Sequence, residues 1–252
     1  MYAWKCWRET RASFIFLLML STVPALLVTL GPGLTERNGW WHFDRSEYTH
    51  NPFMMAHLVS NMVLAALWPS SFLSAVFLGA TAPGSEIEPG TIEYLWTRPR
   101  TRTSLTWTHW SVCLAEMVIV AVVPTYLAAA ILGTLTRTWN LPLLMIAPWM
   151  MVIVGLPMLG LTMLMTALRR SAKGGLIYTA GIVSVYLIFR QLITVPLHLN
   201  LPPLFAGPVT WLMNNKPFVP PSAFPWGSLV RAVLLAAAFP WAAQYLLKRT
   251  EV

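Results

Sequence analysis

Charged residues are scarce in this sequence. They make up 10% of the 252 residues, whereas an ordinary soluble domain carries about 25%. Aspartate occurs once, at Asp44, and 56% of the residues are hydrophobic. With a mean hydropathy of +0.60, the chain has too little polar surface to cover a water-soluble globule. The composition excludes that class and predicts a protein that lies in a bilayer.

The motifs of common enzymes are also absent. The sequence contains no G-x-x-x-x-G-K-[ST] loop, no G-x-S-x-G elbow and no H-E-x-x-H pair, so it has no P-loop, serine-hydrolase nucleophile or zinc-protease helix. Its two cysteines, Cys6 and Cys113, fall on the side assigned below to the cytoplasm, where disulfides are rare. No His, Cys, Asp and Glu residues have the spacing of metal ligands. We therefore expect no enzyme, and no metal or cofactor bound by this chain.

The net charge of +8 raises the question of nucleic acid. The basic residues stand at the ends of apolar runs rather than along one face, as membrane topology requires. A nucleic-acid-binding surface needs a basic patch or stripe instead. The charge pattern therefore favours a membrane protein, and we expect no nucleic-acid partner.

Apolar runs are what the sequence has in abundance. A helix needs about 20 apolar residues to cross a hydrocarbon core of about 30 Å. The sequence predicts an all-α membrane protein, a single transmembrane domain over residues 1–252, with six transmembrane helices. The six stretches are Phe14–Leu30, Phe53–Ala80, Trp110–Leu132, Leu143–Leu168, Leu176–Val195 and Ser228–Leu247.

Lysine and arginine are distributed unevenly between the ends of these stretches. One side holds eleven: three at the N-terminus, three in the second connection, three in the fourth and two at the C-terminus. The other side holds four, Arg37, Arg45, Arg137 and Lys216. Because cytoplasmic segments carry the excess of Lys and Arg, both termini are predicted to be cytoplasmic. The expected location is the cell (inner) membrane, with multiple crossings.

Two further segments are predicted to lie at the membrane surface. Residues 1–12 combine tryptophans with basic residues, which favours an N-terminal interfacial helix lying among lipid headgroups, although a frayed tail is the alternative. Residues 196–227 are apolar yet contain eight prolines. A segment so broken is typical of re-entrant or interfacial structure packed on the outer side.

Ionisable residues within the spans are few. Glu116 and Arg190 are the two candidates for a substrate path, because buried charge in a membrane is usually functional. Snorkelling toward the interface or a hydrogen bond inside the bundle is the alternative for each.

The segment "GSEIEPGTIEYLWTRPRTR", residues 84–102, combines glutamates, a Pro-Gly break and arginines between the second and third spans. Pro89 and Gly90 interrupt the chain, and a short helix is predicted from about Thr91 to Trp96, before Pro99. The topology rule explains the arginines, but acidic residues contribute little to it. A soluble protein partner on the cytoplasmic side would explain the glutamates; a merely solvated loop is the alternative.

This segment resembles the E-x-E-x-G-T-x-E-x-L-x-x-x-P-x-x-R signature that follows the second span in ABC-2 type ABC transporter permeases. The layout of six spans, cytoplasmic termini, a basic interfacial N-terminus and a broken oily segment before the last span is also similar to that family. The matching positions are Glu86, Glu88, Gly90, Thr91, Glu93, Leu95, Pro99 and Arg102.

The resemblance implies a permease subunit of an exporter. Residues 84–104 would contain a coupling helix that docks on P-loop ABC ATPase subunits, which bind ATP-Mg. The other implied partners are a second permease, the same or a homologous chain, and membrane lipid. The substrate path would lie between two permeases, lined by the second and fifth spans, with residues 196–227 as its outer lid. The implied docking residues are Glu86, Glu88, Gly90, Thr91, Glu93 and Tyr94.

A function of another class remains open at this stage. Six spans with tryptophan-rich interfaces also suit a non-transporting membrane anchor or an accessory subunit of a larger membrane complex.

Overall fold

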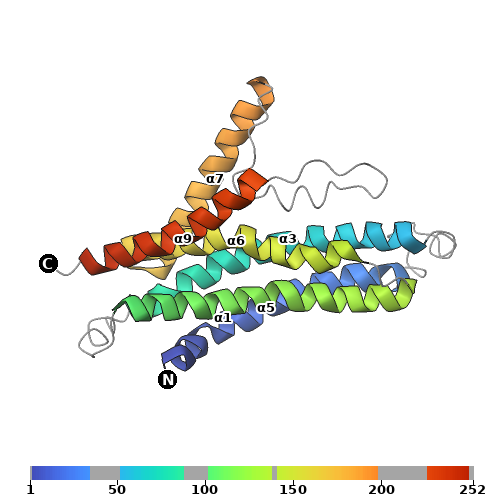
Figure 1. The fold of residues 1–252 in the computed structure, drawn as a ribbon, viewed down its shortest axis with the longest axis horizontal. Helices are drawn as coiled ribbons and strands as arrows, with labels where there is room; N and C mark the ends of the chain where they lie inside the picture. The colour runs from blue at the N-terminus through green and yellow to red at the C-terminus, as the bar shows by residue number, and fades with distance from the viewer. Residues whose placement is uncertain (1, 35–51, 88–101, 138–140, 198–225, 250–252) are drawn as a thin grey trace.

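A computed structural model describes residues 2–34, 52–87, 102–137, 141–197 and 226–249 of the protein. These residues form helices, with no strands in the described ranges; most of the helices run side by side in a bundle, and α7 projects away from it (Figure 1). Each helix contains a stretch long and apolar enough to cross a membrane, which confirms the predicted six-helix architecture. The helices are α1 (Tyr2–Leu34), α3 (Pro52–Ile87), α5 (Arg102–Thr136), α6 (Pro142–Arg169), α7 (Ala172–Leu197) and α9 (Trp226–Arg249).

The helices extend beyond the apolar stretches from which the sequence predicts them. Helix α3 has 36 residues, which at 1.5 Å per residue gives a length of about 54 Å, well beyond a hydrocarbon core of about 30 Å. Helix α1 begins at Tyr2 and continues without a break to Leu34. The expected interfacial helix over residues 1–12 is therefore helical from Tyr2 onward but is the first part of the first spanning helix, because hydropathy marks only the apolar centre.

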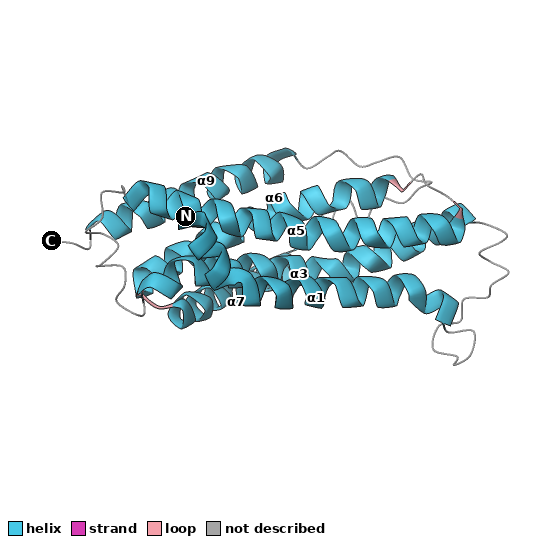
Figure 2. Cartoon of the chain, turned by 90° about the horizontal axis from the view of Figure 1, so that it is seen from below, coloured by secondary structure: helices cyan, strands magenta, loops and turns pink. Residues whose placement is uncertain are grey.

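The start of α1 at Tyr2 and the end of α9 at Arg249 lie at the same end of the bundle (Figure 1). The end of α3, the start of α5 and the turn between α6 and α7 lie at that end too, and Figure 2 shows the bundle from below with the same arrangement. An even number of spanning-length helices brings the chain back to the end from which it started. We call this end the basic end, because the sequence places most Lys and Arg there; its assignment to the cytoplasm remains a prediction.

Helices α3 and α6 form the centre of the bundle. In the apolar 18-residue window of α6, 72% of the residues are buried, and in that of α3, 56%. The two helices approach closely at Gly79 of α3, where an added Cβ would lie 2.6 Å from the carbonyl oxygen of Leu159. Small residues allow such close packing between membrane helices, so Gly79 sets the distance between the two central helices.

Helix α6 also meets its other neighbours through glycine. An added Cβ at Gly155 would lie 3.2 Å from the Met117 sulfur of α5, and at Gly160 it would lie 3.0 Å from Pro240 of α9. At the start of α7, a Cβ on Gly175 would overlap the Thr166 hydroxyl. Glycine on one helix or the other thus brings α6 close to each of these helices.

A short turn joins α6 to α7. Arg170 adopts a left-handed conformation, with φ 50° and ψ 33°, and ends α6. Ser171 caps α7, since its hydroxyl accepts a hydrogen bond from the Gly174 N–H at 3.3 Å and its carbonyl accepts one from Gly175 at 2.9 Å. The Arg169 guanidinium lies over the ring of Tyr178, 3.7 Å from its centroid, a cation–π contact that ties the two helices together beyond the turn.

Hydroxyl side chains inside the helices mostly bond to their own backbone. Such a residue donates to a carbonyl one turn earlier, which satisfies the hydroxyl without a partner helix. This arrangement lets polar residues lie within apolar spans at little cost. It is found at Ser21, Thr29, Ser74, Thr125, Thr162 and Thr166.

Candidate functional site

The segment expected to dock an ATPase connects α3 and α5 at the basic end. Its first residues, 84–87, are the end of α3, and residues 102–104 begin α5. Of the docking residues, Glu86 lies in the last turn of α3. The remaining docking residues, Glu88, Gly90, Thr91, Glu93 and Tyr94, lie outside the described residues, so their role remains a prediction.

The outer segment over residues 196–227 is likewise described only at its two ends. Residues 196–197 end α7 and residues 226–227 begin α9. The part between them lies outside the described residues, and its expected re-entrant structure remains a prediction.

Glu116 is the acidic residue that the structure places inside the bundle. It lies on α5 and is 2% exposed. Its Oε1 is hydrogen-bonded to the hydroxyl of Thr10 on α1, whereas its Oε2 is buried without a hydrogen-bond partner among the described residues. The hydrogen bond inside the bundle that we considered as one alternative for Glu116 is therefore present. A role in a substrate path remains a prediction.

Glu116 is one member of a polar cluster at the α1–α5 contact. We define the polar cluster as Cys6 and Thr10 of α1 with His109, Cys113 and Glu116 of α5, all buried. The Cys6 sulfur lies 3.7 Å from His109 Nε2. The Cys113 thiol donates to the Leu78 carbonyl of α3 at 3.5 Å. The cluster therefore joins the beginnings of two helices and contacts the end of a third.

Sequence reasoning did not bring these residues together. It found no metal-ligand spacing among His, Cys, Asp and Glu and expected no disulfide, and Cys6 and His109 are 103 positions apart. One signal was available: Cys6 and Thr10 are four positions apart, and His109, Cys113 and Glu116 are spaced by four and three. These spacings put the polar residues of each helix on one face.

The chemistry of the cluster is that of hydrogen bonding and proton binding. Among the described residues, no group of three or more His, Cys, Asp and Glu side chains has an arrangement that fits a metal ion. The cluster offers a carboxyl, a hydroxyl, an imidazole and two thiols. Its evident structural effect is to hold the first turns of α1 against α5.

Arg190, the other ionisable candidate, lies elsewhere. It is partly buried on α7, at the last position of the apolar stretch Ala172–Arg190, whereas Glu116 lies in the first half of the stretch Thr106–Leu135. No ion pair joins these two described residues. The structure therefore does not bring the two candidates into a common site.

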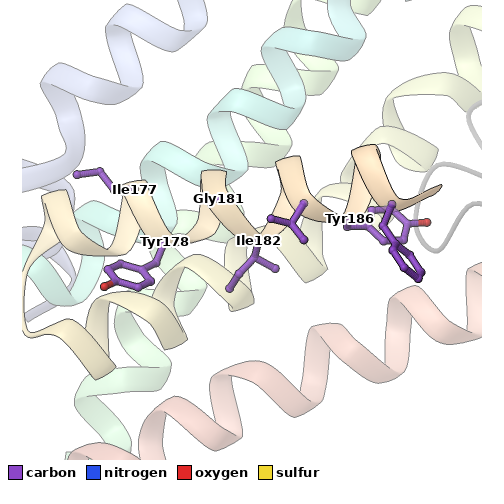
Figure 3. A pocket seen from close by; sticks show the side chains of 7 residues that line it. Ile177, Tyr178, Gly181, Ile182 and Tyr186 are labelled. Atoms are coloured by element: carbon purple, nitrogen blue, oxygen red, sulfur yellow. The ribbon is translucent and has the colours of Figure 1, made fainter. Parts of the chain in front are cut away.

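An apolar groove of about 580 Å³ runs along α7. Figure 3 shows its lining, in which Tyr178 and Ile182 point to the same side of the helix. Exposed apolar surface of this kind is what a bilayer covers. All seven lining residues belong to α7: Ile177, Tyr178, Gly181, Ile182, Val185, Tyr186 and Phe189.

No protein-family model matches this chain, and no curated protein or solved structure matches it either. What the structure supports is a multi-pass membrane protein. The resemblance to a permease family rests on the sequence of the segment between α3 and α5 and on the layout of the spans.

Proposed function

We propose that this chain is the permease subunit of an ATP-binding-cassette exporter of the ABC-2 type. The observation that carries the proposal is the pattern of glutamates with Gly90 and Thr91 between the second and third spanning helices. In support, the chain has six spanning helices and both termini at the end from which this segment emerges. ATP is bound and hydrolysed on separate subunits, in keeping with a sequence that has no P-loop.

The fold suggests how movement of a docked ATPase reaches the membrane. The segment is continuous with the end of α3 and the start of α5. Helix α3 is a central helix, locked to α6 by the close approach at Gly79. A packed interior transmits displacement rather than absorbing it. A push on the segment therefore moves the two central helices together, and in a permease this would open or close the path.

Co-purification with the native membrane tests the proposal. The tagged full-length chain is isolated from its own host in mild detergent, and retained proteins are identified by mass spectrometry. We expect a P-loop ATPase at fixed stoichiometry, and its loss in Glu93→Arg, since a reversed charge in a docking surface costs binding. Glu47→Arg, the same change in the connection predicted to face the other side of the membrane, is the control and should retain the ATPase.

Two results would contradict the proposal. One is that the wild-type chain retains no P-loop ATPase. The other is that Glu93→Arg and Glu47→Arg behave alike in retention and in ATPase activity of the complex. Stoichiometric retention of the chain in an assembly without any ATPase would favour the anchor or accessory function instead.

A further inference from the structure

The surroundings of Glu116 bear on its protonation. The side chain is 2% exposed and lies ten positions into the apolar stretch Thr106–Leu135. One carboxyl oxygen has no hydrogen-bond partner among the described residues. A carboxylate ion that is buried in a membrane span without a counter-charge is costly. The neutral acid avoids that cost.

None of the described groups around Glu116 forms an ion pair with it. From α1 the cluster contributes Cys6, and α5 contributes His109 and Cys113; the described side chains of α3 and those of α6 before its last residue, Arg169, are uncharged. The charges nearest in sequence on α1 are otherwise engaged or exposed. Lys5 pairs with Glu9 at 3.6 Å, and the two arginines at positions 8 and 11 are exposed. No ion pair to Glu116 is present among the described residues.

The single hydrogen of the Thr10 hydroxyl also favours a protonated Glu116. Its hydroxyl has one hydrogen, yet its oxygen lies 3.2 Å from the Cys6 carbonyl, 3.3 Å from the Trp7 carbonyl and in hydrogen-bond contact with Glu116 Oε1. An ionised Glu116 would need that hydrogen and leave the carbonyls without it. A protonated Glu116 instead donates its own hydrogen to the Thr10 oxygen, and Thr10 donates to its own helix. A protonated Glu116 lets Thr10 keep its bond to its own helix, whereas an ionised Glu116 takes the only Thr10 hydrogen.

We propose that Glu116 is a proton-binding site: a neutral acid that donates to Thr10 and thereby holds the first turns of α1 against α5. Without its proton, the Glu116 carboxylate can only accept, and its Oε1 competes with the carbonyls of α1 for the one Thr10 hydrogen in an apolar setting. The α1 contact then weakens, and the segment that carries the exposed Trp4 and Trp7 separates from the bundle. This proposal does not depend on an ATPase partner and stands or falls separately from the transport function.

Labelling with a hydrophobic carbodiimide tests the proton directly. In this reaction a carboxylic acid adds across a carbodiimide C=N bond: the carboxyl oxygen bonds to the central carbon and its proton goes to nitrogen. The O-acylisourea rearranges to a stable N-acylurea, and no group leaves. The probe is dicyclohexylcarbodiimide, applied to the purified full-length chain in detergent, with adducts located by mass spectrometry.

We expect the adduct at Glu116 near neutral pH, with labelling lost as the pH is raised and absent in Glu116→Gln. Glu9, a glutamate of α1 that is paired with Lys5 near the surface, is the internal control and should remain unlabelled. Equal labelling of both glutamates, or no adduct at Glu116 at any pH, would overturn the proposal.

Variants separate a proton site from a merely structural one. Glu116→Gln keeps a neutral donor for Thr10, so its melting temperature should match that of the wild type at neutral pH. At alkaline pH the melting temperature of the wild type should fall, whereas that of Glu116→Gln should not. Thr10→Val removes the acceptor and should lower the melting temperature at neutral pH. Infrared spectra of the wild type alone should contain the carbonyl band of a protonated carboxylic acid, lost at high pH. If that band is absent, or if Glu116→Gln melts at a lower temperature while keeping the alkaline decrease, the proposal is wrong.

Discussion

Helices α6 and α7 follow one another in the chain and differ sharply in burial. Both are apolar enough to span a membrane, yet in the apolar 18-residue window of each helix 72% of the residues are buried in α6 and 11% in α7. The difference lies in where small residues stand. Gly155 and Gly160 of α6 meet other helices closely, whereas a Cβ at Gly181 of α7 would contact nothing within 4 Å. Hydropathy decides that a helix crosses the bilayer, and close contacts decide whether it is central.

The largest expected effect comes from removing the same side chain on the two helices. Leu159 of α6 is fully buried and Leu187 of α7 is 51% exposed. Leu159→Ala leaves a cavity and should lower the free energy of unfolding by about 2–5 kcal/mol. Leu187→Ala removes surface that faces outward and should change it by less than about 0.5 kcal/mol. Unfolding in detergent with increasing denaturant measures both, and similar losses would show that α7 is packed after all.

A second comparison concerns two glycines on α7 itself. Gly175→Ala places a methyl group against the Thr166 hydroxyl and 2.9 Å from the Thr166 Cα. Since the backbone atom cannot rotate away, we expect a loss of about 1–3 kcal/mol. Gly181→Ala is the control, with open space at the new methyl, and should be neutral or slightly stabilising because alanine favours helix. Thermal unfolding in detergent reports both; a neutral Gly175→Ala would mean that α6 and α7 do not touch there.

The cap of α7 is expected to contribute less. Ser171→Ala removes the acceptor for the Gly174 N–H and should cost about 1 kcal/mol. Ser184→Ala changes an exposed serine in the middle of the same helix and serves as the control, with no loss expected. Hydrogen exchange at the amides of Gly174 and Gly175 provides the local measurement. Unchanged exchange there would argue against the cap.

The smallest expected effect is at the contact between Arg169 and Tyr178. Tyr178→Leu keeps an apolar side chain but removes the ring under the guanidinium, which should cost about 0.5–1 kcal/mol. Tyr178→Phe keeps the ring and should retain most of that stability. Melting temperatures of the two variants make the test. If Phe and Leu destabilise equally, the tyrosine hydroxyl rather than the ring holds the contact.

The number of spanning helices could be predicted from the sequence because each needs a long apolar run, and such runs are visible without any partner. The start of α1 at Tyr2 and the extension of α3 to Ile87 could not, because helical hydrogen bonding continues past the apolar stretch. Nor could the identity of the central helices. Gly79 is important only because the backbone of Leu159, 80 positions later, lies beside it.

The two candidate sites also differ in how far the sequence alone could predict them. The segment proposed to dock an ATPase stands out by its local sequence pattern, and most of it lies outside the described residues. For the polar cluster, the spacings within α1 and within α5 put the polar residues of each helix on one face, but only the structure shows that the two faces meet. Thr10 and Glu116 are 106 positions apart, and neither residue alone distinguishes a hydrogen bond within the bundle from a place in a substrate path.

The two-residue turn at Arg170 and Ser171 acts as a short tether. Helices joined so closely cannot lie in separate parts of a membrane, so the start of α7 stays beside the end of α6 although the rest of α7 projects away from the bundle (Figure 1). Among the described helices, α7 has the smallest buried fraction and α6 the largest. The tether therefore keeps the least packed helix attached to the most packed one.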